Sequence, residues 1–241
     1  VGGMEIGKKQ RDPKKSLSRQ VVDSIEEMIM ERKLGPGDVL PTEIQISEEL
    51  QVSKSSVREA IKMLEALGVV EIRRGLCTVI SKNPEQGYMN VMLSHFYLNS
   101  GNEEDLQNFR YIIESAYTTY AIHQATDNDL AAIREKLELF REKLRNGTLE
   151  AEDDILFHGQ ILQATHNSFM ISLGNALNEL FRRSIAIAIR DNPEVALHDH
   201  ESIYQAIVNR DPVAAEKVIA ASARQWAASF KIQDAVAEST L

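Results

Sequence analysis

Three residues in the second half of the chain have side chains that bind metals. Asp154 and His158 are four residues apart, so on a helix they share one face, and His200 stands in a later segment that could bring its imidazole to the same point. One carboxylate with two imidazoles suits Zn²⁺ or another divalent first-row ion. On spacing alone, an aspartate and a histidine four apart more often form a hydrogen-bonded surface pair, so both interpretations stay open.

A second group of polar side chains has the chemistry of a DNA contact. Hydroxyls and cations stand together at the predicted start of a helix, in Ser53, Lys54, Ser55, Ser56 and Arg58. Such groups meet phosphate oxygens and base edges, and the positive end of the helix dipole assists them. Each also has a plainer role, with Ser53 as a helix cap and Arg58 as a solvated side chain.

The elements that would position this group follow from the spacing of apolar residues. Helical spacing occurs in residues 18–34, 43–50 and 54–67, preceded by the candidate N-caps Ser16 or Ser18, Thr42 and Ser53. Residues 69–80 change to a period of two around Arg74 and Gly75, which predicts a two-stranded hairpin. Three helices followed by a hairpin is the order of a winged helix-turn-helix, whose third helix enters the major groove by its N-terminal residues.

The remainder of the chain shows helical patterns alone. Helical windows follow one another from Asn102 and from Asp127, with a stop at Gly147 and with Pro193 and Pro212 at first helical positions. About six helices result, and they would form a bundle of the kind whose core holds small ligands and metals. The predicted fold class is therefore mostly α: an N-terminal winged helix-turn-helix of three helices and a β-hairpin, then an all-α helical bundle.

Length and charge indicate two domains with different partners. We expect a basic N-terminal arm over residues 1–15, a DNA-binding domain over residues 16–82 and a ligand-binding domain over residues 83–241. The net charge of −9 is unevenly placed. Lys and Arg number 14 against 13 Asp and Glu in residues 1–82, but 13 against 23 in residues 83–241. The acidity therefore lies in the second part and does not oppose phosphate binding by the first.

Six cations lie close together at the start of the chain, namely Lys8, Lys9, Arg11, Lys14, Lys15 and Arg19. Such an arm can lie along phosphates, although solvated tails are also often basic. Val1, Gly2 and Gly3 before Met4 look like a remnant of expression cloning. With no apolar run near the roughly 20 residues that span a bilayer, and a lone Cys77, we expect a cytoplasmic protein without a membrane partner.

Residues 40–75, LPTEIQISEELQVSKSSVREAIKMLEALGVVEIRRG, resemble the DNA-binding segment of the GntR superfamily of bacterial regulators. The resemblance implies that operator DNA is contacted by Thr42, Lys54, Ser55, Ser56 and Arg58, with Gly75 at the wing tip near the minor groove. Ser53 and Arg74, which adjoin these residues, complete the predicted contacts. Ile44 and Cys77 depart from the pattern, which usually has an arginine and a second wing glycine there. Without that arginine the operator need not match the commonest sites of the family.

The segments RYIIESAYTTYAIHQAT, DILFHGQILQATHN and HESIYQAIVNRDPVAAEKVI resemble, in order, the motifs of the FCD domain of the FadR subfamily. That resemblance implies a dimerising helical bundle in which Asp154, His158 and His200 hold a divalent metal, Zn²⁺ or similar. Ser222 stands where the family has its last histidine. Because serine is a poor zinc ligand, either three protein ligands leave positions for water or an effector carboxylate, or the site does not fill.

Two further residues match the family in the bundle. Arg110 begins an R-x-x-x-E segment with Glu114 and could hold an effector carboxylate with both ends of its guanidinium, or form a buried salt bridge with Glu114 instead. Asn167 is the other candidate for effector binding, and a turn cap is its plainer role.

These expectations combine into a DNA-binding regulator that is not an enzyme. We expect a homodimer on double-stranded operator DNA, whose affinity changes when an effector binds in the bundle. The family resemblance implies repression, with a sugar acid or hydroxycarboxylate as effector. An acyl-CoA-responsive regulator without metal is one rival, which the three candidate metal ligands speak against. A metal-dependent enzyme is another, but no general base or nucleophile stands near these ligands in sequence.

Overall fold

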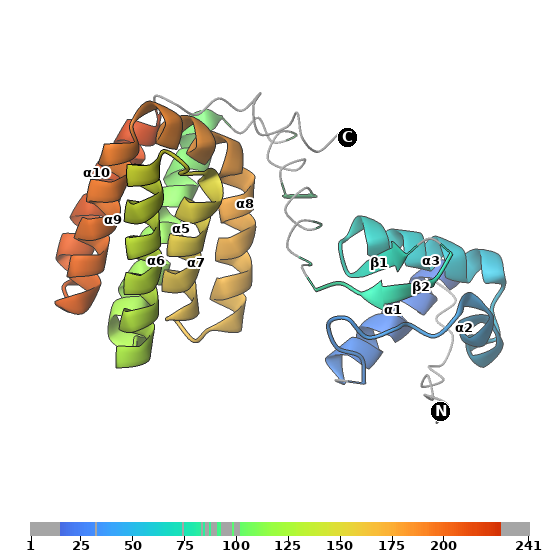
Figure 1. Cartoon of the computed structure of the whole chain (residues 1–241). Coiled ribbons are helices and arrows are strands. Elements are labelled where there is room, and N and C mark those ends of the chain that lie inside the picture. The colour runs from blue at the N-terminus through green and yellow to red at the C-terminus, as the bar shows by residue number, and fades with distance from the viewer. Residues whose placement is uncertain are drawn as a thin grey trace. The chain divides into compact units, whose positions relative to one another are not determined.

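The structure is a computed structural model that describes residues 15–31, 33–73, 75–82, 84, 87, 91, 92, 98 and 102–227. The chain divides into two compact units, Val1–Val91 and Met92–Leu241 (Figure 1). The elements that can be bounded in the described part of the first unit are three helices and a hairpin, and the described part of the second contains helices only. The predicted fold class is confirmed.

The first unit consists of α1 (Leu17–Met30), α2 (Glu43–Leu50), α3 (Lys54–Ala66), β1 (Val70–Arg73) and β2 (Cys77–Ile80). The hydroxyls of Ser16, Thr42 and Ser53 cap the three helices by accepting backbone N–H groups of their first turns, as predicted. The first helix ends earlier than its pattern indicated. The amides of Lys33 and Leu34 both donate to the carbonyl of Met28, a turn that brings Leu34 into the core.

The hairpin lies where the change of period predicted it. The strands β1 and β2 pair antiparallel, from Val70 opposite Ile80 to Arg73 opposite Cys77. Between the strands, Gly75 takes a φ of +75° that suits glycine. Arg74, a predicted DNA contact, lies outside the described residues, as do the arm cations Lys8, Lys9, Arg11 and Lys14.

One apolar cluster holds the first unit together. From α3 it takes Val57, Ala60, Ile61 and Leu64, which pack with residues of α1, α2 and the hairpin. These residues form one stripe of α3, so the opposite side of the helix and its first turn face solvent. Burial of the apolar stripe therefore presents the polar helix start outward.

The helices that can be bounded in the described part of the second unit are α5 (Glu103–Gln124), α6 (Asp127–Asn146), α7 (Ala151–Gln163), α8 (Ser168–Asp191), α9 (Pro193–Val208) and α10 (Pro212–Ala227). Its boundaries follow local signals: Asn102 caps α5, Gly147 ends α6 in the left-handed conformation, and the prolines begin α9 and α10. The cap of α6 is Thr126, one residue before the expected Asp127.

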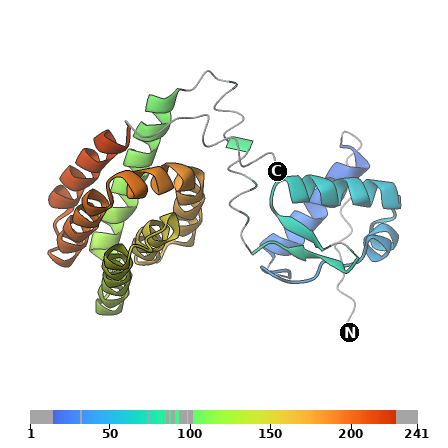
Figure 2. The ribbon, with the colours of Figure 1, turned by 45° about the horizontal axis from the view of Figure 1, so that its top comes forward.

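The six described helices pack side by side as a bundle (Figures 1 and 2). Helix α5 contacts α7, α8, α9 and α10, so it is the central helix of the bundle. The guanidinium of Arg210, in the turn between α9 and α10, donates to the carbonyls of Ile122 and Ala125 at the end of α5. This contact ties that turn to α5 and satisfies carbonyls that a helix end leaves without partners.

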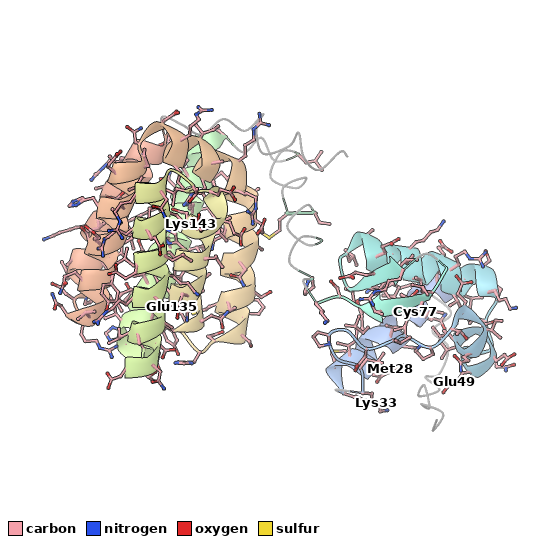
Figure 3. The ribbon with its side chains drawn as sticks, viewed as in Figure 1. Met28, Lys33, Glu49, Cys77, Glu135 and Lys143 are labelled. Atoms are coloured by element: carbon pink, nitrogen blue, oxygen red, sulfur yellow. The ribbon has the colours of Figure 1, made fainter. Side chains whose placement is uncertain are left out.

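The start of α7 is fixed by a charged contact with α6. Figure 3 shows Lys143 on α6, and its ammonium lies 2.6 Å from a carboxylate oxygen of Asp153 on α7. The other oxygen of Asp153 accepts the backbone N–H of Glu150. Asp153 thus caps α7, and the next residue, Asp154, is left for a different role. In the part of the chain that the structure describes, no helix is long and apolar enough for a bilayer crossing.

Close packing of α7 on α8 depends on a glycine. A Cβ built on Gly174 would lie 2.4 Å from a methyl of Leu162, which is fully buried. We expect Gly174→Ala to lower the free energy of unfolding by about 1–3 kcal/mol through overpacking. Gly159→Ala is the control, because the nearest atom to its new Cβ is 3.9 Å away, and it should be neutral or slightly stabilising. Urea unfolding measures both, and equal effects would contradict the packing argument.

A carboxylate at the start of α6 should make the free energy of unfolding depend on pH. Asp129 accepts hydrogen bonds from the amide and hydroxyl of Thr126 and lies 2.9 Å from His166 Nε2. Burial raises the pKa of Asp129, but these hydrogen bonds outweigh it and the pKa is lowered. A lowered folded-state pKa gives stability that is present above the unfolded pKa and lost as the pH falls through the folded one.

We therefore expect Asp129→Asn to lose less stability than the unsubstituted protein between about pH 5 and pH 3. Urea unfolding at both pH values tests this. Parallel losses in the two proteins would show that Asp129 does not contribute to the acid sensitivity.

Candidate metal centre and DNA-binding surface

Asp154 and His158 of α7 meet His200 of α9 inside the bundle, so the alternative in which the three side chains form one cluster is the one observed. All three are buried, and their candidate ligand atoms lie within 4.8 Å of one another. His200 Nε2 is 3.1 Å from Asp154 Oδ1, and His158 Nε2 is 3.9 Å from Asp154 Oδ2. The interpretation as a surface pair is therefore wrong, because Asp154 is only 1% exposed.

Aromatic rings hold the His200 imidazole in place. Phe157 stacks on it with ring centroids 4.2 Å apart, and Phe140 meets it edge-on at 4.6 Å. The two imidazoles are nearly perpendicular, at 79°. His200 is thus packed between aromatic rings while its Nε2 lies 3.1 Å from Asp154 Oδ1.

The other imidazole is oriented by groups from α5. The Tyr117 hydroxyl lies 3.2 Å from His158 Nδ1, and a carboxylate oxygen of Glu114 lies 3.6 Å from the same nitrogen. A hydrogen bond at Nδ1 leaves Nε2 to face the cluster. Tyr117 and Glu114 are thus part of the site, although no local sequence signal marked Tyr117.

The charges in the cluster are those that a metal requires. Burial raises the pKa of Asp154, but attraction to His158, His200 and Arg110 outweighs it and lowers the pKa to about 2. Burial is also the main cause that lowers the pKa of His158, against the opposing effect of Glu114 and Asp154. At neutral pH the site therefore offers an ionised carboxylate and a neutral imidazole, the forms in which both bind metal.

The geometry fits a divalent ion. Among the described residues, neither oxygen of Asp154 has a hydrogen-bond partner of acceptable geometry, and nor does His200 Nδ1. A buried carboxylate whose oxygens lack hydrogen bonds is costly unless a cation satisfies it. Ligands at about 2.0 Å from a tetrahedral zinc lie about 3.3 Å apart. His200 Nε2 is 3.1 Å from Asp154 Oδ1, near that value, while the candidate ligand atoms as a group lie within 4.8 Å of one another.

The cluster opens into a pocket that contains further polar groups. With the three candidate ligands, Arg110, Glu114, Asp199 and Ser222 line it. Asp199 is hydrogen-bonded with Ser222, and burial is the main cause that raises its pKa. Asp199 was not anticipated, because the residue before a ligand on a helix usually points elsewhere. Ser222 lies at the pocket, where its position in the motif placed it.

Arg110 also lines a second pocket next to the first. The two pockets share Arg110, Glu114 and Ser222, and the second is lined in addition by Tyr111 and Phe181. Its guanidinium lies 3.7 Å from a carboxylate oxygen of Glu114 and 4.9 Å above the Phe181 ring. The salt bridge with Glu114 is therefore present, and Arg110 also lines both pockets. Its contact with an effector carboxylate stays a prediction.

Asn167, the other candidate for effector binding, lies elsewhere. Its side chain caps α8 by accepting the amides of Phe169 and Met170, each at 3.1 Å. It is not among the described residues that line either pocket around Arg110. The structure therefore does not bring Asn167 and Arg110 together.

In the first unit, the start of α3 is open to solvent. Ser53, Lys54, Ser55 and Arg58 are exposed and Ser56 is half-buried. The Ser53 hydroxyl accepts the amide of Ser56 and lies 2.9 Å from the Ser56 hydroxyl. Thr42 caps α2 and is also exposed, as is Gly75 in the hairpin turn. Every predicted contact among the described residues is thus accessible, at least in part.

An ion pair that the sequence did not reveal joins α2 to α3. Arg58 Nε lies 3.2 Å from Glu43 Oε1, and Arg58 Nη2 lies 2.7 Å from Glu43 Oε2. The hydrogen bond from Arg58 is the main cause that lowers the pKa of Glu43, and burial opposes it. The Arg58 side chain is nevertheless 60% exposed. It is an oriented surface cation, not a freely solvated one.

Comparison with known proteins decides the family. The family model described as "Bacterial regulatory proteins, gntR family" matches residues 17–80, and the family model described as "FCD domain" matches residues 105–224. The chain is 30% identical over 219 residues to the Uxu operon transcriptional regulator of Escherichia coli (strain K12), covering 82% of this chain and 80% of that relative. The chain belongs to the GntR family.

Other relatives of this GntR-family regulator agree. The HTH-type transcriptional repressor NanR of Salmonella newport (strain SL254) is 28% identical over 86% of this chain and 82% of its own. A solved structure, Streptococcus agalactiae GntR, has a TM-score of 0.66 and 25% identity over 88% of this chain and 99% of that one. The chain is a transcriptional regulator, and the resemblance to the FadR subfamily with its FCD domain is confirmed.

Proposed function

We propose that this GntR-family regulator binds operator DNA through residues 16–82 and is controlled by a small organic acid bound, with a divalent metal, in residues 83–241. The observation that carries the proposal is the buried Asp154, whose oxygens lack hydrogen-bond partners among the described residues, at the end of a pocket lined by Arg110. This site lies in the second unit, apart from the exposed residues at the start of α3, which supports a separate ligand-binding role for that unit.

The DNA contact would be made by the start of α3 and by the wing. Lys54, Ser55 and Arg58 are exposed on the first turns of α3, and Thr42 and Gly75 are exposed on neighbouring elements. We assign contacts also to Ser53, Ser56 and Arg74, on their places in the motif. A homodimer would set two such helices about 34 Å apart on a near-palindromic operator.

The metal would be held by Asp154, His158 and His200, with Zn²⁺ as the ion best suited to one carboxylate and two imidazoles. When bound, it supplies positive charge at the end of the pocket. The chain's own contribution to an anionic effector is the Arg110 guanidinium, which suits a carboxylate with two parallel hydrogen bonds. Ser222 in place of an imidazole leaves room for a hydroxyl or carboxylate oxygen of the effector.

These groups favour a sugar acid or hydroxycarboxylate over an acyl-CoA. The pocket residues include Arg110, Glu114, Asp199 and Ser222, which suit a compact polar ligand and not a long acyl chain. We further propose that the regulator acts as a repressor in the cytoplasm, by similarity to the relatives named as repressors. The effector would change operator affinity by preferring one arrangement of the dimer.

DNA binding is tested at Lys54. We expect Lys54→Ala to weaken binding to a duplex selected from a randomised library by about 10-fold, and to reduce the slope of log affinity against log salt by about 0.9, because one phosphate contact is lost. Lys33→Ala removes the same charge in the same unit, but Lys33 is already paired with Glu31 at 2.7 Å. It should bind within about 2-fold of the unsubstituted protein. Equal effects of the two substitutions would count against α3 as the contact.

Metal and effector are tested together at Asp154. We expect Asp154→Asn to weaken Zn²⁺ binding by more than about 100-fold, because an amide replaces the charged ligand, with operator binding unchanged in the absence of acids. A panel of sugar acids and hydroxycarboxylates should then release DNA from the unsubstituted protein but not from this variant.

Glu152→Gln is the matched control, since Glu152 stands two residues earlier on α7 and pairs with Arg182 instead. It should keep both zinc and the response to acids. Zinc content after dialysis, and gel shifts with each acid, give the readout. An Asp154→Asn variant that retains zinc would refute the assigned ligand set.

A further inference from the structure

Glu43 and Arg58 form a contact whose geometry has a consequence for DNA recognition. Glu43 is the first residue of α2, and Arg58 stands in the second turn of α3, 15 residues later. Both oxygens of one carboxylate meet two nitrogens of one guanidinium, at 3.2 and 2.7 Å. This arrangement fixes the plane of the guanidinium as well as its position.

The contact with Glu43 determines which N–H groups of the Arg58 guanidinium remain free to bind another partner. A guanidinium carries five N–H groups in one plane, of which Nε and one hydrogen of Nη2 point to Glu43. The edge formed by Nη1 and the outer hydrogen of Nη2 is left. That edge is the one that can donate two parallel hydrogen bonds to a further partner, and Arg58 is 60% exposed.

The charge of the pair indicates what kind of partner this is. A carboxylate beside the guanidinium cancels most of its attraction for phosphate, so the pair contributes little to sequence-independent affinity. Its directional donors are unaffected. An arginine that only had to neutralise phosphate would gain nothing from Glu43, whereas one that reads a base edge gains a fixed orientation.

The neighbouring position strengthens the point. Ile44 follows Glu43 on α2, is 50% exposed and has no polar side-chain atom. Ile44 therefore offers no hydrogen bond to DNA beside Glu43, whereas Arg58 offers donors whose direction the contact with Glu43 fixes.

We propose that Glu43 is a positioning residue that holds Arg58 so that its free edge reads the O6 and N7 acceptors of a guanine in the major groove. Glu43 thereby sets operator specificity without touching DNA. The inference rests on the proposed DNA contact by α3.

The test compares Glu43→Gln with Glu48→Gln, which removes the same charge from an exposed position on the same helix. A duplex selected from a randomised library by the unsubstituted protein and a scrambled duplex of equal length are titrated with each protein. We expect both variants to bind the scrambled duplex equally or slightly more tightly. Only Glu43→Gln should lower the ratio of selected to scrambled affinity, by about 5-fold or more, the value of one base contact.

Repeating the selection with Glu43→Gln gives a readout that a general loss of stability would not produce. The guanine preference should weaken at one symmetry-related position of each half-site and persist elsewhere. Replacing that guanine by 7-deazaguanine, which lacks the N7 acceptor, should weaken binding by the unsubstituted protein and not by the variant. Arg58→Lys keeps the charge without the planar edge and should lose the same preference.

Two results are distinguishable if the idea is wrong. If Glu43→Gln and Glu48→Gln give the same specificity ratio and select the same sequence while Arg58→Lys does not, Glu43 has no positioning role. If the unsubstituted protein selects no sequence at all, the proposed DNA contact fails and this inference fails with it.

Discussion

An ionised carboxylate enclosed in a helical bundle constrains everything around it. Asp154 is 1% exposed, and burial by itself would favour its protonated form. The bundle instead surrounds it with two imidazoles and, further out, a guanidinium, so that the charged form prevails. Helices α5, α7 and α9 meet at this point, and each contributes a polar or charged side chain to the cluster. The oxygens of Asp154 lack hydrogen-bond partners among the described residues, and this open capacity is what supports the proposed metal site.

The first unit solves the opposite problem, since its functional groups must stay in water yet hold their directions. Burial of one stripe of α3 turns its first residues outward, and the Ser53 cap fixes where the helix begins. The bidentate contact with Glu43 then restricts a long side chain that solvent would otherwise leave mobile. Exposed groups gain order here from single polar contacts, whereas the groups of the bundle gain it from enclosure.

Some features of both units were predictable because they depend on neighbours within one or two helical turns. The hydroxyl caps, the glycine stop at Gly147 and the hairpin around Gly75 were anticipated for that reason. The first helix ended too late in the sequence interpretation because Leu34 continues the apolar stripe while its amide already closes a turn on Met28. The spacing of apolar residues indicates which side chains are buried, but it does not show whether the backbone at those residues is helical.

By itself the sequence determined that Asp154 and His158 share a helix face, that α3 begins with cations and hydroxyls, and which family motifs surround them, since these are matters of short spacing. Only the tertiary structure decided the partners of these residues. It places Glu43 in a bidentate contact with Arg58, and Tyr117 and Glu114 beside His158. It also places Asp199 in a hydrogen bond with Ser222 at the pocket. These partners lie on different helices or on faces that periodicity leaves undefined. Their approach depends on how the helices pack, and helix packing is set by the whole core and not by any one segment.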